Sequence, residues 1–281
     1  MKQEKVLEII VQEAKKNKNI LALGIGGSFA RKENDFLSDI DLYIITSQDS
    51  ASAYSDIVNK FSTYLPKVLN YNNLGIHQGF GYLYQISYEL SLMVDYNFNT
   101  INSLHSHPTW RNRTVIYDKT SEFEKFIQTE KNKWTNDELY KYHYDLLPKL
   151  TNIFWQDSYL KAYKSIFRGN LLSAIRYQQR MKEILFYLIR LHFRLYANVP
   201  DYPFKNVESD FKEYPEILKI FKLTQPSYSL ESVIESINNT LLFFEKYVPS
   251  YFKTKKVKNI LKTFPLQNLL QNNTNLQIIN T

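Results

Sequence analysis

Two kinds of hydrophobic pattern follow one another along the chain, and the change comes near residue 120. In residues 3–17, apolar positions recur at helical spacing among charged ones, which predicts an amphipathic helix. Short apolar or alternating runs predict strands, because successive side chains of a strand point to opposite faces. The predicted strands lie at residues 20–25, 38–45, 82–88, 90–98 and 115–117, and a further helix is expected over residues 50–68.

Helical spacing dominates from about residue 120 onward. Thr135 followed by Glu138 has the spacing of a capping box, which marks the start of a helix. The expected helices span residues 136–168, 170–197, 208–223, 229–248 and 254–264. Pro148 is expected to break or bend the first of them, because proline donates no backbone hydrogen bond. The pattern therefore predicts an α+β fold of two domains: residues 1–125 form a mixed sheet flanked by helices, and residues 126–281 form an all-α helical bundle.

Composition excludes several function classes. The chain has no cysteine, which excludes disulfides, a thiolate nucleophile and Cys-ligated zinc. It holds no run of about 18 apolar residues, so we expect no membrane span. Residues 1–5, Met-Lys-Gln-Glu-Lys, lack the apolar core of a signal peptide, so a cytoplasmic protein is expected.

The net charge of +7 is unevenly distributed. Residues 1–130 hold 13 Lys and Arg against 15 Asp and Glu, a net −2, whereas residues 131–281 hold 22 against 13, a net +9. A basic half can bind nucleic acid, but no Arg-rich arm, zinc finger or RRM motif accompanies it. We therefore expect a solvated helical surface there and no nucleic-acid partner.

Glycine is scarce, with 7 residues in 281 where average usage would give about 20. Three of the seven fall within residues 24–27, at the end of the first predicted strand, and Ser28 follows them. About ten residues later, Asp39 and Asp41 open the next strand, and residues two apart on a strand share a face. A divalent cation would relieve the repulsion between the two carboxylates, and Mg²⁺ prefers a few carboxylates plus phosphate oxygens. The glycine turn can bring backbone N–H groups close to a phosphate, so the combination predicts a site for Mg²⁺ and a phosphate.

Gly27-Ser28 followed by Asp39-x-Asp41 resembles the motif of the nucleotidyltransferase superfamily with the polymerase-beta-like fold. The resemblance implies that residues 1–125 are a nucleotidyltransferase domain. It also implies that the Gly-Ser turn holds the β- and γ-phosphates of a nucleoside triphosphate, and that the aspartates hold Mg²⁺.

The same resemblance implies a third carboxylate, on a later strand beside the first. Asp95 lies in a predicted strand at a suitable distance along the chain, and Glu89 is the reserve candidate. The alternative role for Asp95 is to cap a turn at the end of that strand. Arg31 and Lys205 are candidates for contact with pyrophosphate, and the alternative for each is an ordinary surface charge.

The chain is also similar to the lincosamide nucleotidyltransferases and to the streptomycin-type aminoglycoside adenylyltransferases, which have a helical C-terminal domain. Weaker matches in the same order lie at Ile116–Thr120, Phe154-Trp155, Arg168–Asn170 and Lys205–Glu208. Some aminoglycoside relatives carry a glutamate general base before the aromatic pair, where this chain has Ile153. Asp157 is the candidate substitute, with a solvated helix carboxylate as the alternative. The general base is therefore expected to be Asp95 or Asp157.

The implied reaction is Mg²⁺-dependent transfer of a nucleoside monophosphate from ATP or GTP to a hydroxyl of a small-molecule antibiotic. A lincosamide is favoured over an aminoglycoside, because one amine and an apolar body suit a basic, aromatic-rich half better than a polycation does. A nucleotidyltransferase that modifies RNA or protein, as in toxin–antitoxin pairs, stays open because of that basic half. The intact Gly-Ser and Asp-x-Asp motifs argue against a non-catalytic binding module. A monomer or a homodimer is expected.

Overall fold

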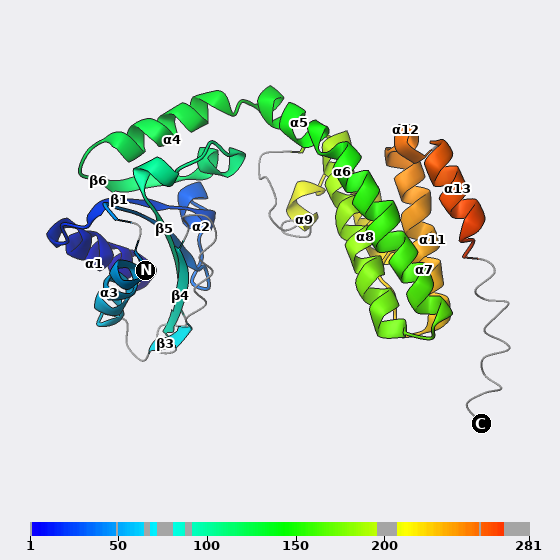
Figure 1. Cartoon of the computed structure of the whole chain (residues 1–281), viewed down its shortest axis with the longest axis horizontal. Helices are drawn as coiled ribbons and strands as arrows, with labels where there is room; N and C mark the ends of the chain where they lie inside the picture. Colours follow the sequence, from blue (N-terminus) through cyan, green and yellow to red (C-terminus); the bar gives the residue numbers. More distant parts are fainter. Residues whose placement is uncertain are drawn as a thin grey trace. The chain divides into compact units, whose positions relative to one another are not determined.

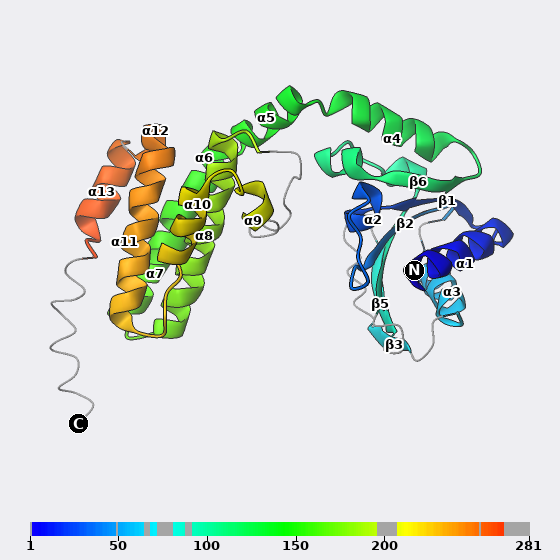
Figure 2. The same cartoon turned by 180° about the vertical axis from the view of Figure 1, so that it is seen from behind.

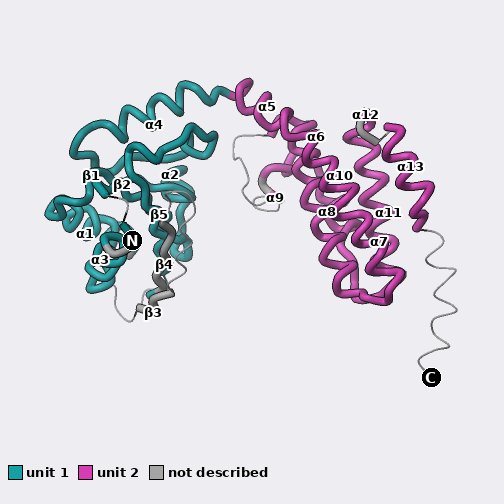
Figure 3. Tube along the Cα trace, in the orientation of Figure 1, with its two compact units in different colours: residues 1–135 teal, residues 136–281 magenta. Residues whose placement is uncertain are grey.

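The structure is a computed structural model that describes residues 2–48, 50–64, 68–71, 81–87, 92–195, 207–252 and 254–266 (Figure 1). Two compact units divide the chain, unit 1 (residues 1–135) and unit 2 (residues 136–281) (Figure 3). The boundary expected at residue 125 falls inside helix α4 (Glu122–Lys133). This helix packs within unit 1, because Phe123 and Ile127 are buried in a core cluster together with Trp110.

Unit 1 is built on a six-stranded mixed sheet with the strand order β3-β4-β5-β2-β1-β6. The strands are β1 (Ile20–Ile25), β2 (Ile40–Thr46), β3 (Val68–Tyr71), β4 (Gly81–Ser87), β5 (Leu92–Asn99) and β6 (Thr114–Asp118). β2 and β5 are parallel, and the other neighbouring strands are antiparallel. The prediction of a mixed sheet is therefore confirmed. The helix expected over residues 50–68 is too long: α3 (Ala51–Ser62) ends earlier, and Val68 begins β3.

The two faces of the sheet have different roles. In β2, Ile40, Leu42 and Ile44 are fully buried, whereas Asp41 and Tyr43 between them are half-buried. The buried positions belong to a core cluster that includes residues of α1 (Lys2–Lys16) and α3. These two helices lie side by side on one side of the sheet in both views (Figures 1 and 2). The opposite face therefore carries the polar side chains of β2, and α4 covers only part of it (Figure 1).

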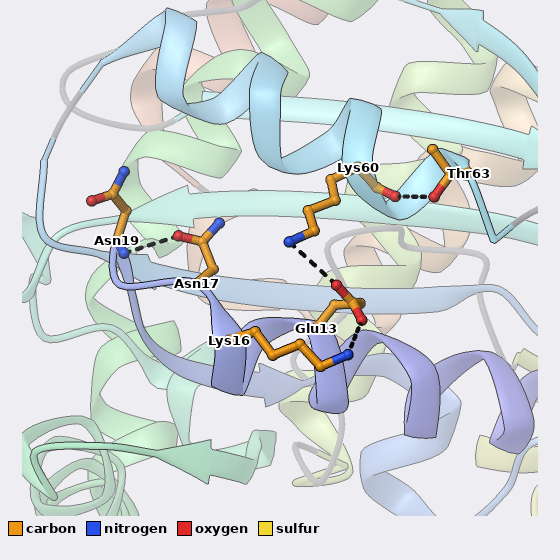
Figure 4. A network of polar contacts seen from close by, with 6 residues as sticks. All are labelled: Glu13, Lys16, Asn17, Asn19, Lys60 and Thr63. Atoms are coloured by element: carbon orange, nitrogen blue, oxygen red, sulfur yellow. Dashed lines mark hydrogen bonds and ion pairs between the residues drawn. The ribbon is translucent and has the colours of Figure 1, made fainter.

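A small ionic network joins α1 to α3 (Figure 4). Glu13 is buried, and its carboxylate accepts a hydrogen bond from Lys16 Nζ at 2.7 Å and pairs with Lys60 Nζ at 3.3 Å. The hydrogen bond from Lys16 lowers the pKa of Glu13 below its ordinary value. In the turn after α1, Asn17 Oδ1 accepts a hydrogen bond from the backbone N–H of Asn19 at 2.9 Å. The network thus ties together the two helices that cover the hydrophobic face.

Every regular element in the described part of unit 2 is helical. The elements are α5 (Asn136–Asp145), α6 (Leu147–Asn152), η3 (Ile153–Tyr159), α7 (Leu160–Phe167), α8 (Leu171–His192), α9 (Val207–Asp210), α10 (Pro215–Leu223), α11 (Leu230–Tyr247), α12 (Pro249–Phe252) and α13 (Lys255–Thr263). The expected break near Pro148 is present, because α5 ends at Asp145 and Pro148 lies in the first turn of α6. The helix expected over residues 208–223 is wrong as a single element: it is divided, and Pro215 starts the second part.

The long helix α8 crosses the core of unit 2 and packs against α7 and α11. It carries two buried cations: Lys182 Nζ donates to Gln225 Oε1 at 2.7 Å, and Arg190 Nε donates to Asp210 Oδ2 at 2.8 Å. Burial lowers the pKa of Lys182 to about 8. Within the described residues, no helix is both long enough and apolar enough to cross a membrane.

Candidate active site

Two of the predicted aspartates lie side by side on the partly open face of the sheet. Asp41 in β2 and Asp95 in β5 are register partners in the one parallel strand pair of the described sheet. Neighbouring strands lie about 4.8 Å apart, and register partners project on the same side. Both side chains are half-buried, whereas the flanking Ile40 and Val94 are fully buried on the other face. Strand pairing therefore brings together two carboxylates that are 54 positions apart in the sequence.

The glycine turn closes directly onto Asp41. Gly26 N–H donates to the backbone oxygen of Asp41 at 2.9 Å. Gly27 has φ +55°, and a Cβ placed on it would lie 1.8 Å from Asp41 Oδ2. Only glycine meets both conditions, since other residues rarely adopt this φ and any side chain would collide with the carboxylate. The predicted turn residue and the predicted acidic residue thus form one unit.

Three further predicted residues lie around this unit. Ser28 is in the first turn of the five-residue helix α2 (Gly27–Arg31). Arg31 ends that helix, and its Nε donates to Glu33 Oε2 at 2.6 Å. Asp39 is exposed and lies just before β2, two residues from Asp41. Across the ranges that the structure describes, no three His, Asp or Glu side chains converge as a metal-binding cluster.

The comparison with protein families shows which family the chain belongs to. A model of the streptomycin adenylyltransferase family matches residues 1–259, which is most of the 281-residue chain. The chain belongs to the streptomycin adenylyltransferase family. It is therefore a nucleotidyltransferase, as the Gly-Ser and Asp-x-Asp motifs predicted.

Other comparisons add little to this assignment. No curated protein matches the chain. Among solved structures, an aminoglycoside 6-adenyltransferase from Bacillus subtilis is 12% identical, over 94% of this chain and 97% of that one, with a TM-score of 0.35. A nucleotidyltransferase-like protein from Exiguobacterium sibiricum is also 12% identical, over 96% of this chain and 90% of that one, with a TM-score of 0.37. Similarities at these scores do not establish a shared fold.

The donor set on the sheet fits a hard divalent cation. Asp41 and Asp95 offer carboxylate oxygens in register on one face, and Mg²⁺ binds through one or two carboxylates plus phosphate oxygens and water. Asp41 Oδ2 is held at the position that a side chain at Gly27 would otherwise occupy. These residues of the adenylyltransferase-family chain therefore suit the metal that the sequence predicted, with the exposed Asp39 as the third candidate ligand.

Asp157 lies in unit 2, in the seven-residue π-helical element η3 between α6 and α7. π-helical turns are rare and frequently mark functional sites. The Asp157 carboxylate pairs with Lys161 and, at 3.7 Å, with Arg180. The hydrogen bond from Lys161 lowers the pKa of Asp157, which reduces its strength as a base. Its role as a general base stays a prediction.

A cavity of about 550 Å³ opens beside Asp157 in unit 2. Its charged lining consists of Asp157, Lys161, Arg176, Arg180 and Glu183. Burial raises the pKa of Glu183 above its ordinary value, so this carboxylate is a stronger base than an exposed glutamate. Sequence reasoning missed Glu183, because it has no local motif and its place in the cavity depends on how α8 packs against η3.

Sequence reasoning also missed Arg113, which follows the short helix η2 (Pro108–Asn112). Its guanidinium lies over the Tyr43 ring, with Cζ 4.5 Å from the centroid, and next to Gly26. Arg113 could have been found only by knowing that β6 pairs with β1, which is not visible in the local sequence. Lys205 and the reserve candidate Glu89 lie outside the described residues.

The aromatic pair in η3 is part of the core of unit 2. Phe154 and Trp155 are both buried, and both rings contact Phe244 of α11. Trp155 also contacts Tyr159. This pair therefore anchors η3 against α11.

Proposed function

We propose that the chain transfers a nucleoside monophosphate from ATP or GTP to a hydroxyl group of a small-molecule antibiotic. The observation that carries the proposal is the placement of Asp41 and Asp95 in register on one face, with the Gly27 turn closed onto Asp41. Family membership supports the reaction type. Unit 2 is proposed to bind the acceptor.

The residues of unit 1 would supply positioning and charge. Asp41 and Asp95, with Asp39, would hold Mg²⁺, which when bound neutralises charge on the phosphates and lowers the pKa of an acceptor hydroxyl. The backbone of the glycine turn, with Ser28, would hold the β- and γ-phosphates. The acceptor oxygen forms a bond to the α-phosphorus, the bond between the α-phosphorus and the bridging oxygen breaks, and pyrophosphate leaves. In-line alignment of these groups supplies much of the rate.

The hydroxyl proton would pass to a carboxylate base. Asp95 is the first candidate because it lies beside Asp41, and Asp157 is the second. The ion pairs of Asp157 with Lys161 and Arg180 lower its proton affinity, and a base is most effective when its pKa lies near the working pH. Glu183, with its raised pKa, meets that condition better than Asp157 within the same cavity.

The charge of the unit 2 cavity favours an acceptor with few positive charges. Three basic side chains line it against two acidic ones, and one of the acids, Asp157, is already paired with two of the bases. A polycation would meet net repulsion there, since like charges in a partly desolvated site interact strongly. A lincosamide, with a single amine and an apolar body, is therefore the proposed acceptor.

An aminoglycoside is the second candidate, and the family match favours it. The matching family is described as streptomycin adenylyltransferase, and the match spans residues 1–259. If the acceptor is an aminoglycoside, we expect its cationic groups to meet acidic side chains other than those of this cavity.

The test is incubation of the purified chain with labelled ATP or GTP, Mg²⁺ and a panel of lincosamides and aminoglycosides. Mass spectrometry should show the addition of one nucleoside monophosphate to one drug class. Asp41→Asn should abolish the addition with the fold intact. Asp56→Asn is the matched control, because Asp56 is exposed on α3, which packs on the opposite face of the sheet, and it should retain activity.

Three outcomes would overturn parts of the proposal. Labelling of RNA or protein with no labelling of any drug would replace the acceptor class. Modification of aminoglycosides alone would reject the charge argument drawn from the cavity. Full activity of Asp41→Asn would reject the proposed metal site.

A further inference from the structure

Strand register places Arg113 beside the glycine turn. β6 pairs antiparallel with β1, with Thr114 opposite Ile25. Continued by one residue beyond each strand, the same register sets Arg113 opposite Gly26. The backbone N–H of Arg113 donates to Trp110 O at 3.1 Å, which fixes the end of η2 just before the strand. The position of this arginine is therefore set by the sheet and by the short helix before it.

The guanidinium of Arg113 occupies the space that a side chain at position 26 would need. A Cβ on Gly26 would lie 2.9 Å from Arg113 Nη1, and 2.9 Å from Tyr43 Cε2. The guanidinium also stacks against the Tyr43 ring, with Cζ 4.5 Å from the centroid. Tyr43 in turn contacts Trp110 edge-on, at 5.3 Å between ring centroids. Arg113 is thus held between a side-chain-free backbone and an aromatic ring.

No described acidic group neutralises this cation. Among the residues that the structure describes, no carboxylate lies within ion-pair distance of Arg113, and its buried Nε donates to no acceptor. By contrast, the nearby Arg31 is paired with Glu33 at 2.6 Å. A positioned, uncompensated guanidinium beside a backbone turn is suited to an anion with several oxygens, because its fixed fork of donors matches phosphate geometry.

We propose that Arg113, held beside Gly26, supplies the cation of a polyphosphate subsite that binds the β- and γ-phosphates of the nucleoside triphosphate. The inference rests on the proposed function, since it assigns a ligand to the neighbourhood of Asp41. Stacking on Tyr43 restricts the guanidinium before the ligand arrives, so little side-chain entropy is lost on binding. Arg113, rather than the ion-paired Arg31, is then the principal cation of unit 1 for this ligand.

The experiment measures binding of ATP, GTP, AMP and inorganic tripolyphosphate to the full chain by calorimetry. Arg113→Gln should weaken ATP or GTP and tripolyphosphate by about tenfold or more, because it removes charge-assisted hydrogen bonds. AMP has no β- or γ-phosphate, so its binding should change less than about threefold, within the range of long-distance charge effects. Arg113→Lys keeps the positive charge and the aliphatic part of the side chain but lacks the planar set of guanidinium donors. Its affinity for ATP, GTP and tripolyphosphate should lie between those of wild type and Arg113→Gln.

Lys119→Gln is the matched control. Lys119 is exposed just after the other end of β6, and its replacement lowers the net charge from +7 to +6, as Arg113→Gln does. We expect wild-type affinities for all four ligands. Thermal unfolding of each variant reports whether the fold is kept, and Arg113→Lys provides the comparison if Arg113→Gln does not fold.

The binding measurements distinguish a failure of this inference from a failure of the proposed function. Wild-type binding of ATP or GTP by a folded Arg113→Gln chain would overturn this inference and leave the proposed function standing. An equal loss for AMP and for the triphosphates would also overturn it, because the arginine would then act on the nucleoside or the α-phosphate. A wild-type chain that binds no nucleoside triphosphate would overturn the proposed function, and this inference with it.

Discussion

Gly27 has two roles: it adopts a left-handed backbone conformation, and it leaves room for the Asp41 carboxylate. Replacement of Gly27 by alanine should separate the effects of the two. The added Cβ would lie 1.8 Å from Asp41 Oδ2. To reach an ordinary contact, the carboxylate would have to move by about 1 Å or more, and a misplacement of that size costs about 100-fold in rate. The left-handed φ of +55° adds about 1 kcal/mol of backbone strain. We therefore expect a large loss of activity with a modest loss of stability.

The assay compares nucleotidyl transfer at saturating nucleotide with the free energy of unfolding from a denaturant titration. Gly169→Ala is the matched control. Gly169 also has a left-handed φ, +70°, but nothing lies within 4 Å of a Cβ placed on it. This variant should lose about 1 kcal/mol from backbone strain alone and keep its activity. The difference between the two variants then isolates the contact with Asp41.

Two results would refute the reasoning. If Gly27→Ala keeps more than about a tenth of the wild-type rate, the position of the Asp41 carboxylate is not critical to about 1 Å. If Gly169→Ala loses as much activity as Gly27→Ala, the effect comes from backbone strain and not from the collision with Asp41.

Two further predictions concern stability. Glu130 is 3% exposed, and its carboxylate accepts three hydrogen bonds of 2.8 to 3.0 Å. Glu130→Ala should lower the free energy of unfolding by about 3 kcal/mol, since a typical hydrogen bond contributes about 1 kcal/mol net. Urea unfolding of Glu130→Ala and of Glu124→Ala, a control at an exposed position on the same helix, checks this expectation. Equal losses of stability in the two variants would contradict it. The hydrogen bond from Lys16 lowers the pKa of Glu13 in the folded state, so the contribution of Glu13 is complete above its unfolded pKa and is lost as the pH falls through the folded value. The stability difference between wild type and Glu13→Gln should therefore shrink between pH 7 and pH 3, and a difference that grows on acidification would reject the assignment.

Much of the fold was predictable because local patterns carried it. The alternation of Ile40, Leu42 and Ile44 with polar residues predicted β2 as a strand with two different faces, and the structure confirms it. The helix α4 was not predicted as an element, and the boundary placed at residue 125 falls inside it. Its amphipathic stripe is short, and its partner Trp110 lies outside the helix, so a local pattern did not reveal it.

The candidate site was predictable only in part. Local spacing was enough to propose Gly27, Ser28, Asp39 and Asp41 as site residues. The structure brings Gly27 against Asp41 and places Asp39 just before β2, exposed. Asp95 could be proposed only by resemblance, and the parallel pairing of β5 with β2 is what places it beside Asp41.

The sequence by itself determined the strand, turn and strand of the candidate site, since a scarce residue type and an alternating pattern are local properties of the chain. The tertiary structure decided which distant groups meet them. The register of β6 on β1 brings Arg113 to Gly26, and the packing of α8 against η3 brings Glu183 to the cavity beside Asp157. These contacts depend on hydrogen bonding and burial between segments far apart in the chain, so the spacing of residues within one segment cannot predict them.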